Sequence, residues 1–192
     1  MKTAIAAIAL GTLLPAAACF AGDLEQEAAE AREISTRLLT ELGAALKQAM
    51  ASGGPEGAIG VCKDVAPGIA ARLSRESGAR VSRVSLKARN PMLGQPDAWE
   101  QQVLADFDRR AGAGEPPAGL EQAAFVDEPA GRYFRYVKAI PVQPLCLACH
   151  GTPETIAPSV RERLAADYPH DRAKGYSPGE IRGAVSIKKP AF

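Results

Sequence analysis

The sequence predicts an α+β fold, in which helices come first and an antiparallel sheet follows. The first part of the chain repeats apolar residues every three or four positions, the period of one helical face. The second part contains segments that alternate between apolar and polar residues, as half-buried strands do. Helices that precede strands, instead of alternating with them, are typical of the α+β class.

The first 21 residues have the composition of a secretory signal peptide. Lys2 gives a positive start, Ala4 to Leu14 is apolar, and small residues follow up to Ala21, after which we expect cleavage. The apolar run is too short to cross a bilayer. We therefore expect a periplasmic protein in which residues 22–192 form one domain.

Cys19 offers an alternative fate for the N-terminus. The segment PAAAC weakly resembles a lipoprotein cleavage box, although such boxes usually carry Leu where this chain has Ala16. Lipidation of Cys19 would tether an otherwise soluble domain. The net charge of +1 argues against nucleic acid as a partner, and no later segment is apolar enough to predict a transmembrane span.

Two helices are predicted to open the domain. The first covers Leu24 to Met50, and the glycines of ASGGPEG end it. The second runs from Pro55 to Ser77. Pro67 lies inside it and cannot donate a hydrogen bond to the carbonyl group of Lys63, so we expect a kink just after Cys62.

The rest of the chain predicts the sheet and two further helices. Residues 82–89 alternate as a strand that ends before Pro91. Asp97 and Glu100 have the spacing of a capping box at the start of a helix. A hairpin turns at Glu128 to Gly131, and its returning strand, Tyr133 to Val142, leads to Cys146. A helix from Pro153 to Tyr168 and a strand from Ile181 to Lys188 complete the prediction.

Cys146, Cys149 and His150 form a C-x-x-C-H motif, the pattern at which haem c is attached. The two thiols bond covalently to the haem, and the imidazole binds one face of the iron. A redox dithiol normally opens a helix of a thioredoxin-like unit, which this late position does not match. A zinc site would need further ligands at close spacing, and the sequence has none. One motif indicates one covalent haem c.

The ligand of the opposite iron face comes from a short list. Met50 and Met92 are the methionines that follow the expected cleavage site, and Met92 is better explained by packing. His170 is the only other histidine, in a polar segment that predicts an exposed side chain. Cys62 has no cysteine partner after cleavage and precedes the expected kink on an apolar stripe. Cys62 is therefore favoured as the iron ligand, with His170 or a ligand-free face as alternatives.

Four segments together resemble a known family. They are AIGVCKDVAPGIA, RVSLKARNP followed by PDAWE, CLACHG, and GYSPGEIRGAVSI. In this order they resemble the exported haem c-binding domains with a PAS-like fold, long classed as a domain of unknown function. The resemblance extends from about Glu30 to Lys188. It implies a PAS-like antiparallel sheet flanked by helices, and Cys62 as the axial ligand opposite His150.

Three functions fit such a site. A thiolate stabilises ferric iron, so reduction would weaken the bond to Cys62 and open a site for NO or CO, as in a redox or gas sensor. An electron carrier for an unknown redox partner would keep its coordination unchanged. An enzyme such as a peroxidase would need an acid–base group that only His170 offers, so we do not expect an enzyme.

Other residues are expected around the cofactor. Arg89 or Lys87 would pair with the haem propionates, because buried carboxylates need cationic partners. The alternative for both is a solvated strand face. Ile59 and Ala66 are expected to form part of the pocket wall.

Overall fold

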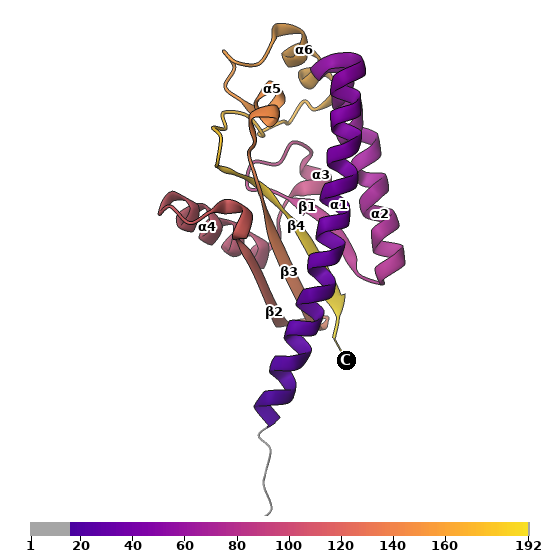
Figure 1. Cartoon of the computed structure of the whole chain (residues 1–192), viewed down its shortest axis with the longest axis vertical. Helices are drawn as coiled ribbons and strands as arrows, with labels where there is room; N and C mark the ends of the chain where they lie inside the picture. The colour runs from indigo at the N-terminus through magenta and orange to yellow at the C-terminus, as the bar shows by residue number, and fades with distance from the viewer. Residues whose placement is uncertain (1–15, 192) are drawn as a thin grey trace, which may run out of the picture.

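A computed structural model describes the backbone of residues 16–191 and the side chains of residues 23–191. It contains a four-stranded antiparallel sheet with helices on both faces (Figure 1), which confirms the expected α+β class. The α-helices are α1 (Ala16–Gly60), α2 (Ala66–Ser77), α3 (Pro91–Gly94), α4 (Ala98–Gly112), α5 (Leu147–His150) and α6 (Pro158–Asp167). The strands are β1 (Arg80–Val84), β2 (Glu121–Glu128), β3 (Gly131–Pro141) and β4 (Ile181–Pro190). Short helices of other types are η1 (Val61–Val65), η2 (Pro117–Gly119) and η3 (Pro144–Cys146).

Most of the predicted signal peptide, residues 1–15, lies outside the described residues, and so does the side chain of Cys19. Cleavage after Ala21 and lipidation of Cys19 therefore remain predictions. Within the part of the chain that the structure describes, no helix combines the length and the apolar character needed to cross a membrane.

The long N-terminal helix α1 begins at Ala16 and is broken once, at Gly54. Gly54 has φ 63° and ψ −166°, backbone angles that glycine adopts without a steric penalty. Helical geometry resumes at Pro55, where the second helix was expected to begin. The predicted break in ASGGPEG is confirmed.

Cys62 lies in η1, a π-helical turn that separates α1 from α2. The N–H group of Ala66 donates to the carbonyl oxygen of Val61, five residues earlier, which is the spacing of a π-helix. Pro67 has no N–H group to donate to Lys63, and the wider π turn accommodates the missing hydrogen bond. The kink expected just after Cys62 is therefore present, as a π-helical interruption of the second helix over Val61–Val65.

The strands are ordered β1-β4-β3-β2, and every neighbouring pair is antiparallel. Alternate residues of β3 face opposite layers. Phe134 and Tyr136 join the core formed with α1 and α2, whereas Val137 and Ala139 pack with α4. Figure 1 shows α1 and α2 on one side of the sheet and α4 on the other. The hairpin turn is confirmed, because Glu128 pairs with Gly131.

The predicted strand over residues 82–89 was wrong in its second half. β1 ends at Val84, and residues 85–90 form a tight turn. The hydroxyl group of Ser85 accepts a hydrogen bond from the N–H group of Lys87 at 3.2 Å, which bends the backbone out of the sheet. Arg89 is consequently buried against the motif segment and is not on a strand face. The predicted helix at Pro153 was also too long, since α6 begins at Pro158.

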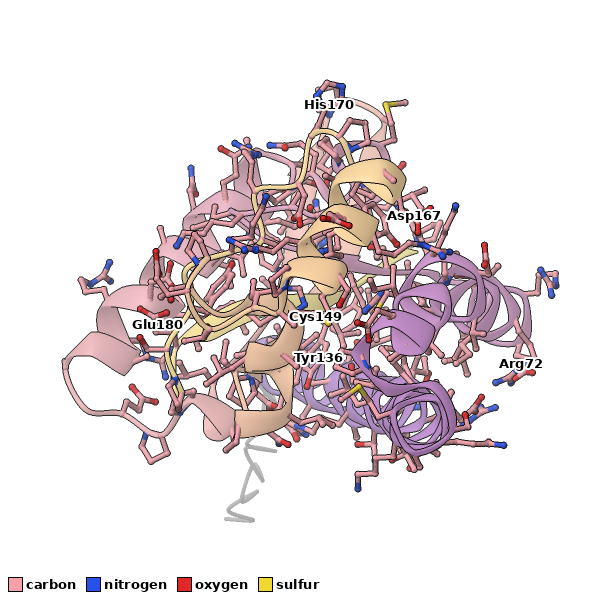
Figure 2. The ribbon with its side chains drawn as sticks, turned by 90° about the horizontal axis from the view of Figure 1, so that it is seen from above. Arg72, Tyr136, Cys149, Asp167, His170 and Glu180 are labelled. Carbon is pink, nitrogen blue, oxygen red and sulfur yellow. The ribbon has the colours of Figure 1, made fainter. Side chains whose placement is uncertain are left out.

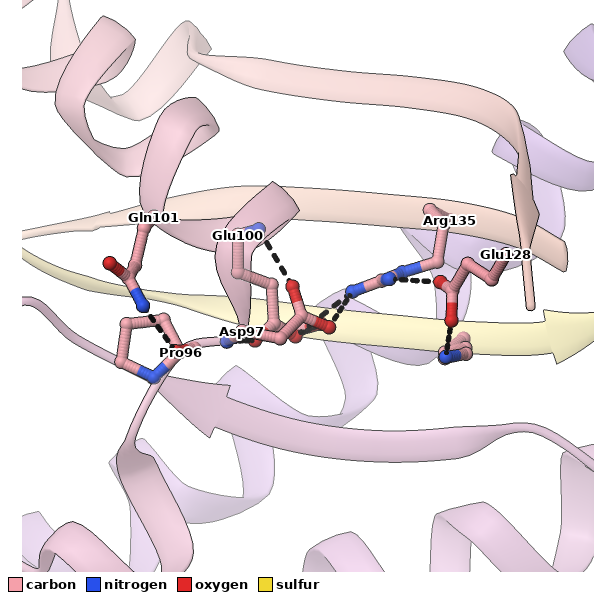
Figure 3. Close-up of polar contacts among 8 residues, drawn as sticks. Pro96, Asp97, Glu100, Gln101, Glu128 and Arg135 are labelled. Atoms are coloured by element: carbon pink, nitrogen blue, oxygen red, sulfur yellow. Dashed lines mark hydrogen bonds and ion pairs between the residues drawn. The ribbon is translucent and has the colours of Figure 1, made fainter. Parts of the chain in front are cut away.

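A buried arginine joins α4 to the sheet (Figure 3). The capping box of Asp97 and Glu100 is present as predicted, and both carboxylates also meet the guanidinium group of Arg135 on β3. Arg135 lies 2.6 Å from Asp97 and 2.6 Å from Glu128, and its side chain is 2% exposed. The cap of α4 and the end of the hairpin therefore share one cation.

Candidate functional site

The C-x-x-C-H motif occupies a single helical turn that follows β3. η3 and α5 place Cys146, Cys149 and His150 three and four positions apart, so their side chains lie on the same side of the turn. Cys149 and Cys146 are both free thiols and half-buried. The N–H group of Val142 donates to the carbonyl oxygen of Glu180 at 2.8 Å, which holds the entry to the turn against the segment before β4.

Gly151 follows His150 at a position that has no room for a side chain. A Cβ atom there would lie 2.3 Å from Oγ1 of Thr155 and 2.7 Å from the carbonyl oxygen of Leu147. The N–H group of Gly151 donates to that same carbonyl group at 3.0 Å. Glycine is therefore required for the chain to leave the motif in this direction.

The imidazole ring of His150 is fixed through both nitrogen atoms. Nδ1 lies 2.7 Å from the carbonyl oxygen of Ala173, so Nδ1 carries the proton and donates it. Nε2 is therefore unprotonated, and its lone pair accepts a hydrogen bond from the Nε–H group of Arg182 at 3.3 Å. An imidazole that donates from one nitrogen to a backbone carbonyl group is typical of metal-binding histidines.

The pKa of His150 is held well below its usual value. Burial is the main cause, and the positive charges of Arg182 and Arg89 add to it. A neutral imidazole is the form that binds metal ions. The surroundings of His150 therefore favour the state needed for ligation.

Arg89 supports the motif from the side of Nδ1. Its guanidinium group donates to the carbonyl oxygen of Cys149 and pairs with Asp171 at 3.2 Å. The side chains of Arg89 and Asp171 are 8% and 2% exposed, so this ion pair is nearly buried. Asp171 also accepts from the N–H group of Ala173, at 2.8 Å. The pair fixes the carbonyl group to which His150 donates.

Tertiary folding brings Cys62 close to the motif. Ile59, one helical turn before Cys62, packs in the cluster against which Cys149 also packs, and Lys63, the residue after Cys62, pairs with Asp167 on α6 at 2.7 Å. The pKa of the Cys149 thiol is raised, mainly by burial, so Cys149 lacks the lowered pKa of a redox-active dithiol. Tyr168 belongs to the same cluster, so the segment before Cys62, the end of α6 and the motif meet in one packed region.

The expected pocket wall is apolar where the structure describes it. Ile59 is 2% exposed and packs in a cluster with Ile156, Val160 and Tyr168, against which Cys149 also packs. Ala66 is buried at the first position of α2. Lys87 is exposed, and its Nζ atom lies 4.7 Å from the centre of the Tyr176 ring.

His170 is not brought to the motif. Its side chain is exposed in the turn after α6. Figure 2 shows it at the outer edge of the molecule, whereas Cys149 lies near the centre of the same view. The expectation that the side chain of His170 is exposed is therefore confirmed.

Comparison with known proteins identifies the family. A family model described as Tll0287-like matches residues 21–190. The chain belongs to the Tll0287-like family. No curated protein sequence matches this Tll0287-like chain. Among solved structures, its fold is similar to one described as the crystal structure of the cyanobacterial heme-protein Tll0287, with a TM-score of 0.62 and 23% identity. That match covers 89% of this chain and 96% of the other.

The residues present in this Tll0287-like chain fit a covalently attached haem. Two free thiols lie one helical turn apart, and the Nε2 atom of the neighbouring imidazole is unprotonated, with a lone pair that can bind iron once Arg182 no longer donates to it. An apolar wall lies nearby, and the turn that carries a third thiol, Cys62, adjoins it. Ligation at Nε2 requires the N–H group of Arg182 to leave that nitrogen, because the two compete for one lone pair.

The sequence did not identify three residues that contact His150. Arg182 donates to its Nε2 atom, Ala173 accepts from its Nδ1 atom, and Tyr176 packs edge-on at 6.2 Å between ring centres. All three lie in or next to GYSPGEIRGAVSI, which carries the family resemblance without indicating individual roles. The sequence feature that could have identified Arg182 is its charge at the start of an otherwise apolar strand.

Proposed function

We propose that this protein is a periplasmic mono-haem c-type cytochrome that acts as a redox or small-gas sensor, with His150 and Cys62 as the two axial ligands. The observation that supports the proposal is that the segment carrying Cys62 packs with the C-x-x-C-H turn, which lies far away in the sequence: Ile59 shares a cluster with Cys149, and Lys63 pairs with α6. Bound haem would supply one-electron chemistry and, on its reduced iron, a site for NO or CO.

The chain would provide two unequal ligands. His150 is held through Nδ1 by the carbonyl group of Ala173, and Ala173 is itself held by Asp171, which accepts from its N–H group, so the position of His150 is fixed. Cys62 lies on a π turn, a feature that is frequent at functional sites. Thiolate binding is favoured by the positive charge of ferric iron and loses strength when that charge falls. Cys62 is therefore the ligand expected to leave on reduction.

The surroundings of η1 allow such a release. Lys63 pairs with Asp167 on α6 at 2.7 Å, with 48% of its side chain exposed. An ion pair exposed to this degree restrains a segment weakly. Val65 is exposed, and Pro67 follows at the start of α2 as a hinge. Movement of this turn would carry a change of redox state from the site to the surface.

The test begins with the haem content of the full chain matured in a periplasm. We expect one haem that resists extraction, and loss of that attachment when Cys146 and Cys149 are both replaced by Ala. Electron paramagnetic resonance of the ferric protein should show a low-spin thiolate signal. The signal should vanish in Cys62→Ala and persist in Val65→Ala, a neighbouring substitution that leaves the thiol in place.

Resonance Raman spectra of the reduced protein separate the two physiological roles. Five-coordinate ferrous iron that binds CO rapidly supports the sensor. Six-coordinate ferrous iron with Cys62 still bound would identify an electron carrier instead. A peroxidase would show peroxidase activity in the wild-type chain, and His170→Ala would abolish it. We do not expect such activity.

A further inference from the structure

Two arginines on neighbouring strands near His150 have no acidic partner among residues 23–191: Arg182 contacts Nε2, and Arg83 lies on β1, two residues before Ser85, to which Arg182 donates. Arg83 on β1 and Arg182 at the start of β4 are both half-buried. Among residues 23–191, neither forms an ion pair, whereas Arg89 has Asp171. Arg182 donates to neutral acceptors: Oγ of Ser85 at 3.1 Å, the carbonyl oxygen of Lys87 at 3.4 Å and Nε2 of His150 at 3.3 Å.

These unpaired charges are unfavourable as they stand. Guanidinium groups do not deprotonate in proteins, so burying one without a counter-ion costs free energy. Burial lowers the pKa of both Arg83 and Arg182, and the charges of Arg89 and Arg83 lower that of Arg182 further. A fold that places two such groups together favours binding of a compensating anion.

The local charges indicate how many negative charges that anion carries. Arg89 lies 3.1 Å from Nδ1 of His150, Arg182 lies 3.3 Å from Nε2, and Arg83 lies on the strand next to β4, so three positive charges surround the ring. Asp171 contributes one negative charge, which is already engaged by Arg89. Two positive charges remain without a partner. A ligand with two carboxylates would match them in number, and guanidinium groups bind carboxylates in a bidentate geometry.

We propose that Arg83 and Arg182 bind the two propionate carboxylates of the haem attached at Cys146 and Cys149. This inference rests on the proposed function. Iron binding at Nε2 removes the acceptor that Arg182 uses there, and a propionate replaces it. Arg182 thereby exchanges a neutral partner for an anionic one.

This assignment differs from the sequence-based expectation for Arg89 and Lys87. Arg89 already donates to Asp171 and to the carbonyl oxygen of Cys149, on the Nδ1 side of the ring. Lys87 is exposed and lies over Tyr176. Arg89 is therefore a positioning residue for His150.

The test compares the full haem-loaded chain with Arg83→Gln, Arg182→Gln and the double variant. Loss of a positive charge beside the haem stabilises ferric iron, so the reduction potential should fall in each single variant and further in the double. The propionate bending bands of the resonance Raman spectrum should shift in the same variants. Arg161→Gln, which changes an exposed arginine on α6, should leave both measurements unchanged.

Charge-preserving variants keep the proposal falsifiable if a glutamine variant fails to fold. Arg83→Lys and Arg182→Lys should retain potentials closer to wild type than their glutamine counterparts. Equal falls in the lysine and glutamine variants would overturn the proposal, and so would unchanged propionate bands in both glutamine variants. A wild-type chain without covalent haem would refute the proposed function itself, whereas a loaded chain with unmoved potentials would refute only this inference.

Discussion

Arg89 and Asp171 form a nearly buried ion pair directly behind the C-x-x-C-H turn, 3.2 Å apart. The pair links the turn after β1 to the segment after α6, and both residues contact the backbone around His150. A nearly buried pair is tolerated only while both partners are present. The position of His150 therefore depends on residues far from it in the sequence.

Replacing Asp171 by Asn should destabilise the protein and loosen His150. The amide can still accept from Ala173 but leaves the charge of Arg89 without compensation, at a cost of about 3 kcal/mol. Chemical denaturation measures the loss, and the low-spin signal of the ferric haem protein should broaden. Asp64→Asn, an exposed substitution on η1, is the control and should change neither property. Equal stability of Asp171→Asn and wild type would show that the pair does not support the site.

Gly151→Ala should impair the motif more than a typical surface substitution. The added methyl group would overlap Thr155 and the backbone of Leu147, so the turn after His150 must shift. Overpacking of this kind costs about 1–3 kcal/mol. The yield of covalently attached haem should fall with stability. Gly112→Ala is the matched control, because a Cβ there meets nothing within 4 Å, and it should be neutral or slightly stabilising.

Arg135→Ala should be among the most destabilising single changes outside the motif. Glu100, whose side chain is 4% exposed, and Asp97 would lose their cationic partner, and Glu128 would keep only Lys188. Breaking a buried ionic network in this way costs about 3–5 kcal/mol. Arg132→Ala, an exposed change on the same strand, provides the comparison in urea denaturation. Similar midpoints for the two variants would contradict the role of Arg135 in joining α4 to the sheet.

Glu128 should contribute to stability in a pH-dependent way. Its hydrogen bond with Lys188 is the main cause of a lowered pKa, and Arg135 lowers the pKa further. Burial acts in the opposite direction and cancels part of this shift. In the unfolded chain the pKa is higher, at about 4.3, so the unfolded state binds more protons as pH falls. The stabilisation is present above that value and is lost as pH falls through the lower, folded pKa.

Unfolding free energies measured across that acidic range check this prediction. Glu128→Gln should reduce the slope of stability against pH in the range where Glu128 titrates. Asp127→Asn alters the exposed neighbour on β2, for which the structure describes no ion pair, and should retain the wild-type slope. A slope unchanged by Glu128→Gln would rule out this carboxylate as the source.

Local features of the fold could be predicted from the sequence where local chemistry decides them. The break at Gly54, the capping box of Asp97 and the hairpin turn at Glu128 depend on residues next to one another in the chain. The end of β1 could not be predicted, because alternation continues past Val84. There the hydroxyl group of Ser85 and contacts with the motif segment override the pattern.

The sequence by itself determined that the chain carries a C-x-x-C-H motif and a separate cysteine beside a proline kink. Only the tertiary structure decided that the segment around Cys62 packs with Cys149, that Arg89 supports His150, and that Arg83 and Arg182 lie near His150 without an acidic partner among residues 23–191. Spacing along the chain can indicate a covalent motif because its atoms are neighbours. Charge balance and ligand convergence depend on which distant segments the packed core brings together.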